Sequence, residues 1–292
     1  MNAAPQKIVI GTRRSPLALA QAELALARLS KFFPRSECVL REFVTQGDKK
    51  LAWSLEKSGG KGLFTTELED ALLAGEIDIA VHSGKDLPTE MRAGLAVAGC
   101  LRREHANDVL AVRAGVNVPA TIATGSPRRR SQAKKLFPQA EFSEIRGNVH
   151  TRLQKIADGL ADATFLAVAG LKRLRISAFP GIEFRQFEKT EIVPAAGQAA
   201  IALQCRAEDA TLYAQACSRS TTHEFAVERA FLEALGEGCH TSFAVNFSRG
   251  RLLIFREDVG FRTLRTAFPK NRAGIETRVR EILSELFSEA KS

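Results

Sequence analysis

The feature that most restricts the fold of this chain is a regular alternation between short β-branched runs and longer stretches with apolar residues at helical spacing. In the N-terminal part this pattern predicts strands at 7–11, 39–44 and 77–82 and helices at 16–33 and 63–74. Successive strand, helix, strand units of this kind fold as a parallel sheet with right-handed crossovers. We therefore expect the N-terminal part to form an α/β unit.

The alternation restarts further along the chain and then gives way to a different pattern. The predicted strands lie at 108–112, 121–124, 141–145 and 163–169, with helices at 128–137 and 149–159. The C-terminal part predicts a helix at 222–235, a hairpin of strands 243–248 and 251–256 that turns at Arg249 and Gly250, and a terminal helix at 274–290. Thr221 and Glu224 have the spacing of a capping box at the start of the first of these helices. A second α/β unit followed by a small α+β domain is therefore expected.

The chain has an excess of positive charge, and most of that excess falls in one stretch. Of 292 residues, 42 are Lys or Arg and 33 are Asp or Glu, which gives a net charge of +9. Residues 121–155 contain eight basic and two acidic side chains, so they hold six of these nine charges. The 45% hydrophobic content excludes a disordered chain. The charge therefore belongs to a folded protein with an anionic partner: a small molecule, a nucleic acid or a membrane surface.

Basic and hydroxyl side chains follow the predicted strands of both α/β units. Thr124 and Ser126 lie between a strand and a helix, and residues 11–15 and 82–86 occupy similar places in the first unit. The carboxyl ends of parallel strands are where open α/β sheets bind ligands, and the free N–H groups of helix starts favour anions. We therefore expect a strongly cationic cleft between two such edges. His82, taken alone, is expected to be a hydrogen-bonded core residue.

The cysteines and the apolar runs restrict the class of protein further. The five cysteines include no CxxC pair, so the sequence predicts free thiols rather than a zinc or iron–sulfur site. Cys239 stands apart because it follows Gly238 in a glycine-flanked turn. Near the start only Ile8, Val9 and Ile10 form an apolar run, which is shorter than the about 7–15 residues of a signal peptide, and the longest later run, around Phe165 to Leu171, is far below the roughly 20 of a membrane span. These features predict a soluble, cytoplasmic protein.

Seven short stretches carry a resemblance to a known family. They are residues 11–21, 59–64 with 67–69, 81–88, 146–149 with 151–153, 166–174, 194–198 and 238–239. With these motifs in this order, the chain resembles the porphobilinogen deaminases over nearly its full length. The resemblance implies an α/β fold of two lobes like those of periplasmic binding proteins plus a small α+β C-terminal domain. It places the first domain at residues 1–101 plus 195–216, the second at 102–194 and the third at 217–292.

The same resemblance implies an activity, a cofactor and a set of site residues. Enzymes of this family are transferases that condense four porphobilinogen molecules head to tail with release of ammonia. They build the chain on a dipyrromethane cofactor, held by a thioether to one cysteine, and release linear hydroxymethylbilane by hydrolysis. The motifs place that cysteine at Cys239 and the catalytic aspartate at Asp86. The other cofactor-binding positions, with no metal among their ligands, fall on Arg13, Ser15, Ser83, Lys85, Thr124, Ser126, Arg128, Arg129, Arg146, Gly147, Arg152, Ala167, Ala169 and Gln198.

The charge pattern agrees independently with this class of substrate. Each porphobilinogen carries an acetate and a propionate, so a dense arginine lining suits a growing chain of such units. A fixed carboxylate at Asp86 would stabilise the cationic azafulvene that forms when ammonia leaves. We therefore expect a monomer that acts on a small molecule and has no nucleic-acid or membrane partner.

Two other classes of function remain open from the residues alone. A non-catalytic anion-binding protein would also have two α/β lobes with a cationic cleft, but it would give Cys239 and the C-terminal domain no role. A nucleic-acid binder is motivated by the charge only. Several residues depart from the family pattern, and with them we expect normal chemistry and altered cofactor retention. They are Gly84, Gly125, Pro127, Arg130, Ala199 in place of a glycine after Gln198, Glu237 in place of a glycine before Cys239, and Ser242.

Overall fold

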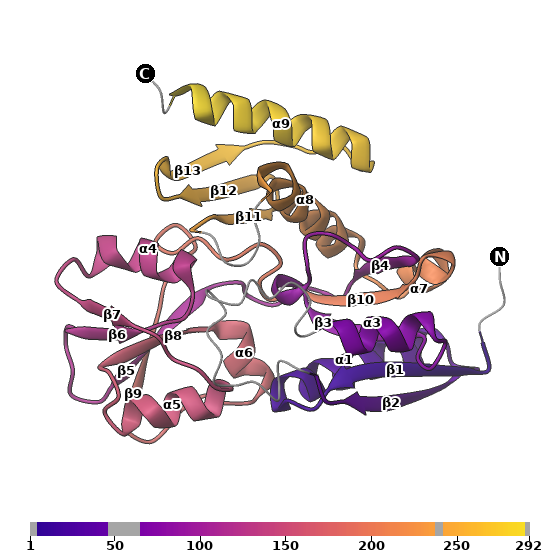
Figure 1. The fold of residues 1–292 in the computed structure, drawn as a ribbon, viewed down its shortest axis with the longest axis horizontal. Coiled ribbons are helices and arrows are strands. Elements are labelled where there is room, and N and C mark those ends of the chain that lie inside the picture. Colours follow the sequence, from indigo (N-terminus) through magenta and orange to yellow (C-terminus); the bar gives the residue numbers. More distant parts are fainter. Residues whose placement is uncertain (1–4, 46–64, 237–241, 290–292) are drawn as a thin grey trace. The chain divides into compact units, whose positions relative to one another are not determined.

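The computed structural model describes residues 5–45, 65–236 and 242–289, and the chain divides into two compact units (Figure 1). Unit 1 comprises Met1–Glu104 and Ala199–His223, and unit 2 comprises His105–Gln198 and Glu224–Ser292. Within the described ranges, no helix is both long and apolar enough to span a membrane. The division into three domains that the family resemblance implies stays a prediction.

Unit 1 is built on a five-stranded mixed sheet with the order β2-β1-β3-β10-β4. The predicted strands β1 (Lys7–Arg13), β2 (Glu37–Phe43) and β3 (Ile79–Ser83) are confirmed as a parallel set, with β1 in the middle. Two strands that the sequence pattern did not predict, β4 (Leu95–Cys100) and β10 (Ile201–Arg206), complete the sheet, and β10 runs antiparallel to both β3 and β4. The sheet is therefore parallel only in its predicted half.

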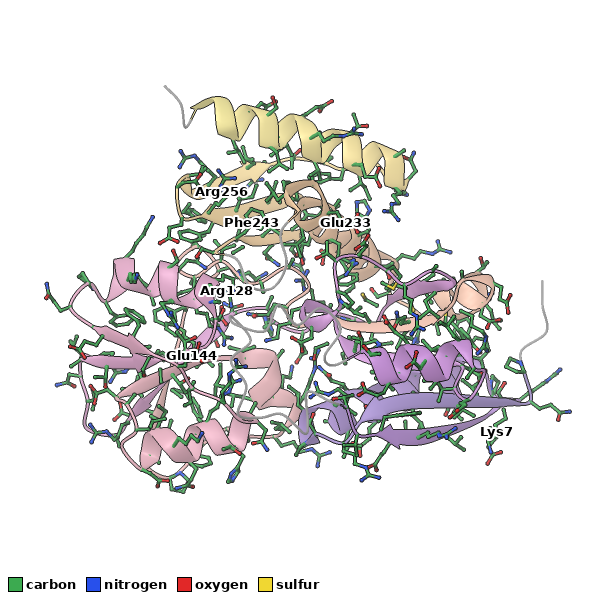
Figure 2. The ribbon with its side chains drawn as sticks, viewed as in Figure 1. Lys7, Arg128, Glu144, Glu233, Phe243 and Arg256 are labelled. Carbon is green, nitrogen blue, oxygen red and sulfur yellow. The ribbon has the colours of Figure 1, made fainter. Side chains whose placement is uncertain are left out.

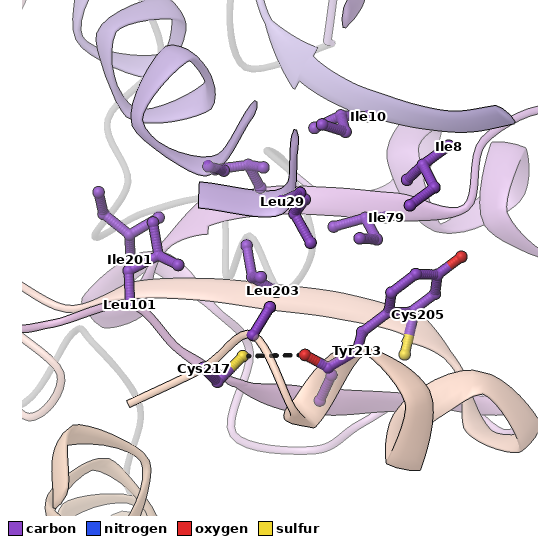
Figure 3. Close-up of a cluster of buried hydrophobic side chains, with 14 of the residues drawn as sticks. Ile8, Ile10, Leu29, Ile79, Leu101, Ile201, Leu203, Cys205, Tyr213 and Cys217 are labelled. Atoms are coloured by element: carbon purple, nitrogen blue, oxygen red, sulfur yellow. Dashed lines mark hydrogen bonds between the residues drawn. The ribbon is translucent and has the colours of Figure 1, made fainter. Parts of the chain in front are cut away.

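The helices of unit 1 are positioned by their start signals and by their apolar faces. The helix α1 (Pro16–Phe32) begins with Pro16 in its first turn, and the Ser15 hydroxyl caps it by accepting from the Ala18 N–H at 3.3 Å. Its buried side packs Leu29 against Ile8 and Ile10 of β1 in the main core of this unit (Figure 3). The other helical segments among the described residues of this unit are α3 (Thr66–Leu73), η1 (Gly84–Asp86), η2 (Ala207–Asp209) and α7 (Ala210–Ala214).

Unit 2 contains a second five-stranded sheet with the same plan. Its order is β7-β6-β8-β5-β9, in which β6 (Thr121–Ala123) is parallel to β7 (Glu141–Ser143) and β8 (Ala163–Ala167), while β5 (Asp108–Arg113) is antiparallel to β8 and β9 (Ile182–Gln186). The prediction of a strand to residue 169 was wrong. The strand β8 ends at Ala167, and the chain turns there into α6 (Val168–Arg173).

Two further helices of unit 2 begin with side-chain caps immediately after a strand end. The Ser126 hydroxyl caps α4 (Pro127–Leu136), and the Asn148 side chain caps α5 (Val149–Ala157) by accepting from the Thr151 N–H at 2.9 Å. Both helices begin within a residue of their predicted positions. The strand-end loops that the sequence marked as ligand-binding are therefore short and fixed by these caps.

The C-terminal part of unit 2 is a three-stranded antiparallel sheet with two helices. The predicted hairpin of β11 (Ala244–Ser248) and β12 (Arg251–Arg256) is confirmed, and its turn residues Arg249 and Gly250 both have positive φ, of 50° and 74°. The third strand, β13 (Gly260–Arg265), was not predicted. Apolar side chains from the helices α8 (Arg219–Leu235) and α9 (Arg272–Glu289) form a core with this sheet.

The predicted capping box at Thr221 was wrong, because α8 starts at Arg219 and Thr221 lies inside the helix. The Thr221 hydroxyl instead accepts from the Arg103 N–H at 3.1 Å. The capping position belongs to Ser218, whose hydroxyl accepts from the Thr221 N–H at 3.4 Å.

Ala199 is a buried residue with a φ of +67°, a left-handed backbone that costs a residue with a Cβ about 1–2 kcal/mol. We expect Ala199→Gly to stabilise the protein by a net ~1 kcal/mol. Glycine removes the cost of the left-handed backbone, but it also raises the conformational entropy of the unfolded chain, which offsets part of that gain. Thermal unfolding should then show a rise of roughly 2 °C. The neighbouring Ala200→Gly, at a buried position outside the left-handed region, should instead lower the melting temperature. Equal losses in both variants would contradict the strain at Ala199.

Candidate functional site

The polar residues that follow β1 and β3 line a small pocket in unit 1. Because the two strands are parallel neighbours, their carboxyl ends meet at one edge of the sheet. The pocket has a volume of about 70 Å³. Its walls are formed by Arg13, Ser15, Leu17, Ala18, Gln21, Thr65, Val81, His82, Ser83 and Asp86. Four of the predicted site residues, Arg13, Ser15, Ser83 and Asp86, are thus brought together.

Six residues of this pocket, Gln21 and Thr65 among them, were not among the predicted site residues. The buried Gln21 side chain exchanges hydrogen bonds of 2.8 and 3.0 Å with the Ser83 hydroxyl, which fixes that hydroxyl against α1. Gln21 closes the first family motif, so the sequence carried a signal for it. Thr65 is also buried, and its hydroxyl oxygen makes no hydrogen bond to the described residues. Nothing in the sequence pattern marked Thr65.

Asp86 reaches the pocket through a tight turn at the end of β3. The single-turn helix η1 carries Lys85 and Asp86, and the buried Gly84 begins it with an N–H that donates to the Ala200 carbonyl at 2.9 Å. This bond ties the turn to the chain just before β10. The Asp86 side chain is exposed and Lys85 is half-buried. The turn therefore presents a charged carboxylate at the mouth of the pocket.

His82 is confirmed as a hydrogen-bonded core histidine. It is buried, and its Nε2 lies 2.9 Å from the Gln204 Oε1 on the neighbouring strand β10. Burial lowers the pKa of His82 to about 4, with the charge of Arg13 adding to that effect and the bond to Gln204 opposing it. The imidazole is therefore neutral at physiological pH.

In unit 2 the hydroxyl residues after β6 shape the start of α4. Thr124 is buried, and its hydroxyl accepts from the Ser126 N–H at 3.3 Å, while Ser126 caps the helix by accepting from the Arg129 N–H at 3.4 Å. Arg130 donates to the Thr124 carbonyl at 3.2 Å. Both hydroxyl residues thus hold the loop that delivers the two arginines of the first helical turn.

Those two arginines, Arg128 (labelled in Figure 2) and Arg129, both donate to a buried aspartate that the sequence did not mark. Arg128 donates to the Asp108 Oδ2 at 2.8 Å, and Arg129 donates to its Oδ1 through Nη2 at 2.6 Å and Nε at 3.1 Å. The Gln198 amide donates to the same carboxylate at 3.2 Å. Arg128 and Arg129 are only 5% and 6% exposed. Their predicted roles toward a cofactor stay predictions, since the described contacts are with protein groups.

The charges in this cluster do not cancel. Burial raises the pKa of Asp108, but the charges and hydrogen bonds of Arg128 and Arg129 outweigh burial and lower it to about 2. The pKa of Arg128 is lowered by burial and by Arg129, and Asp108 opposes both. One carboxylate thus faces two guanidinium groups, which leaves one surplus positive charge in a mostly buried place. A buried surplus charge favours an anionic ligand nearby.

The loop between β7 and α5 holds two further predicted residues, Arg146 and Gly147, and a third, Arg152, lies in α5. Arg152 donates to the Gly147 carbonyl at 2.8 Å, so the helix that follows the loop also fixes it. Gly147 has a φ of +120°, and a Cβ there would lie 2.8 Å from the Thr151 Cγ2, so the position requires glycine. Arg146 is half-buried, and its Nε is buried without a hydrogen-bond partner among the described residues. This loop therefore offers a donor to a ligand.

The last predicted positions are placed as follows. Ala167 is half-buried at the start of α6, and Ala169 is buried in the first turn of that helix. Cys239 and the motif at residues 59–64 lie outside the described residues. Burial raises the pKa of the Cys205 thiol to about 12 and that of Cys217 to about 11, so neither is a thiolate near neutral pH.

Comparison with known proteins shows which family the chain matches. The family model described as "Porphobilinogen deaminase, dipyromethane cofactor binding domain" matches residues 8–214. The porphobilinogen deaminase of Syntrophus aciditrophicus is 39% identical over 287 residues, which cover 95% of this chain and 92% of the relative. That of Coxiella burnetii (strain RSA 493) is 42% identical over 250 residues, covering 82% of this chain and 80% of the relative. Among solved structures, the periplasmic aliphatic sulphonate binding protein SsuA from Escherichia coli matches with a TM-score of 0.45 and 15% identity, over 80% of this chain and 71% of that chain. The chain belongs to the porphobilinogen deaminase family.

Proposed function

We propose that this chain is an active porphobilinogen deaminase, which joins four porphobilinogen molecules head to tail with loss of ammonia and releases linear hydroxymethylbilane. The observation that carries the proposal is the pocket of unit 1, where the exposed carboxylate of Asp86 and the cation of Arg13 share one strand edge. A cation and a carboxylate at one edge suit a substrate that is anionic at its side chains and becomes cationic at its reacting carbon.

The residues present fit a dipyrromethane cofactor. Each of its two pyrroles carries an acetate and a propionate, so the group needs several cationic or hydroxyl donors. Each unit, taken by itself, offers such donors. Unit 2 has the surplus charge beside Asp108 and the buried Nε of Arg146, which has no partner among the described residues. Unit 1 has Arg13 and Lys85, and the Thr65 hydroxyl, which makes no hydrogen bond to the described residues. When bound, the cofactor supplies the free pyrrole α-carbon to which the substrate is joined.

Asp86 has two roles in the proposed reaction. When the bond between the aminomethyl carbon and nitrogen of porphobilinogen breaks, ammonia leaves and the substrate becomes an azafulvene cation. The fixed negative charge of Asp86 stabilises this cation. The pyrrole whose free α-carbon forms the new carbon–carbon bond must then lose the proton on that carbon. The exposed carboxylate of Asp86 can accept this proton. Arg13 meanwhile binds a substrate carboxylate and holds the ring in place.

We further propose that Cys239 carries the cofactor as a thioether. Intact mass under denaturing conditions should show an adduct of two pyrrole units on the wild type after incubation with porphobilinogen. The adduct should be absent from Cys239→Ala and present in Cys38→Ala, since Cys38 is a half-buried thiol on β2 that serves as the matched control. A wild-type chain that stays unmodified and inactive after incubation with porphobilinogen would contradict the proposed function.

We also propose that the enzyme works as a cytoplasmic monomer on this small substrate alone. A nucleic-acid binder would lose its ligand in a salt titration, because phosphate contacts release counterions. Porphobilinogen turnover should depend only weakly on salt, since its carboxylates meet partly buried cations. Tight nucleic-acid binding at physiological salt without turnover would favour the alternative class.

A further inference from the structure

Three buried polar side chains from three elements of unit 1 form a hydrogen-bonded chain that ends at the pocket. Glu69 of α3, Gln204 of β10 and His82 of β3 are 6%, 0% and 6% exposed. The Gln204 Nε2 lies 2.9 Å from the Glu69 Oε1, and the Gln204 Oε1 lies 2.9 Å from the His82 Nε2. His82 also lines the pocket with Arg13 and Asp86. The chain therefore connects α3, which covers this face of the sheet, to the pocket wall that Asp86 also lines.

The direction of each hydrogen bond in this chain is fixed by its neighbour. The Gln204 amide nitrogen donates to Glu69 and also lies 3.0 Å from the Met91 sulfur, so the amide oxygen must face His82. An amide oxygen can only accept, so the His82 Nε2 must carry the proton. A neutral histidine has one such proton, which leaves its Nδ1 unprotonated.

The charge of His82 matters because of what else faces it. Arg13 from β1 and Asp86 from η1 line the same pocket as His82, while Lys85 precedes Asp86 in η1 and Glu69 from α3 reaches His82 only through Gln204. A protonated imidazole in this wall would add a second cation beside Arg13 and would compete for Asp86. The reacting carbon of the proposed substrate is itself cationic, so a charged His82 would repel the group that Asp86 must stabilise.

We propose that the Glu69–Gln204–His82 chain holds His82 as a neutral, Nε2-protonated imidazole, so that the charge of Asp86 stays available to the cationic reacting group. His82 is thus a positioning residue that acts through Asp86. The kinetic part of this inference rests on the proposed function, whereas the protonation state of His82 does not.

The test converts Gln204 into a charged acceptor. In Gln204→Glu a carboxylate lies between His82 and Glu69, and we expect the added negative charge beside the His82 Nε2–H to raise the pKa of His82. Nitrogen-detected NMR of the five histidines, with His82 assigned by its loss in His82→Gln, reports both tautomer and titration. The wild type should show the Nε2–H form without titration between about pH 5.5 and 8.5. In Gln204→Glu, kcat should fall at least ~10-fold on the acid side of the midpoint that NMR gives for His82.

Two neutral variants serve as controls and as a second route. Gln204→Leu removes the bond without adding charge, and His82→Gln keeps a neutral donor at the Nε2 position, so both should keep the wild-type shape of the pH profile. If Gln204→Glu does not fold, Glu69→Gln replaces it in the test. A second amide at position 69 lets the Gln204 amide group rotate by half a turn, so His82 should then be a mixture of its two neutral tautomers. A wild-type His82 that titrates near pH 7, or a Gln204→Glu profile that stays flat while His82 titrates, would overturn the inference. Wild-type turnover in the same assay would show that the proposed function survives that failure.

Discussion

Replacing Asp86 with asparagine is expected to lower kcat for porphobilinogen consumption by about 10²–10⁴-fold. The asparagine has the same shape but carries no charge for the azafulvene cation, and it cannot accept the proton that the coupled ring must lose. The KM should change little, because the substrate carboxylates are bound by cations such as Arg13 rather than by Asp86. The fold should be unaffected, since the Asp86 side chain is exposed.

Three measurements separate this effect from a structural one. Steady-state kinetics give kcat and KM, and urea unfolding should differ from the wild type by no more than ~0.5 kcal/mol. Glu23→Gln removes an equally exposed carboxylate from α1, outside the pocket, and should leave all three values unchanged. A wild-type kcat in Asp86→Asn would contradict the proposal that Asp86 stabilises the azafulvene cation and accepts the proton.

The fold could be predicted from the sequence where an element carries its own pattern. The strands β1, β2 and β3 are short runs that alternate with predicted helices, so both their presence and their parallel pairing followed. The strand β13 has the sequence GFRTLR, in which two arginines interrupt the alternation, and it exists through its pairing with β12. The strand β10 follows the second α/β unit rather than the alternation of the first, and its place in the sheet comes from pairing with segments far apart in sequence.

The candidate site divides in the same way. Polar residues just after β1, β3 and β6 could be found because parallel strands end at one edge of a sheet. Asp108 could not, because it stands at the start of a strand. Since β5 runs antiparallel to β8, the first residue of β5 pairs with Ala167, the last residue of β8, and so reaches the same edge. Only the pairing of the two strands reveals that Arg128 and Arg129 share a buried counterion.

Replacing Asp108 with asparagine is expected to destabilise the protein by about 3–5 kcal/mol, because it leaves two buried guanidinium groups without their anion. Urea unfolding at neutral pH measures the loss. Asp258→Asn is the matched control, since it breaks an exposed pair with Arg256 in the same unit and should cost less than ~1 kcal/mol. Asp108→Glu keeps the charge and should recover part of the stability if the fold tolerates the longer side chain. A loss in Asp108→Asn no larger than in the control would show that the cluster does not depend on this carboxylate.

The same carboxylate should make the protein sensitive to acid over a defined range. The pKa of Asp108 is about 2 in the folded protein and 3.8 as its ordinary value, so the folded state binds the proton less tightly than the unfolded chain. The stability that Asp108 supplies is therefore complete above about pH 4 and is lost as the pH falls toward 2, by roughly 2 kcal/mol in total. Asp108→Asn has no such proton to bind, so the gap in unfolding free energy between wild type and variant should narrow by this amount between pH 5 and pH 2. If the difference in unfolding free energy between wild type and variant stays constant over that range, Arg128 and Arg129 do not hold Asp108 in its charged form. The net charge of +1 assigned to this cluster would then be wrong.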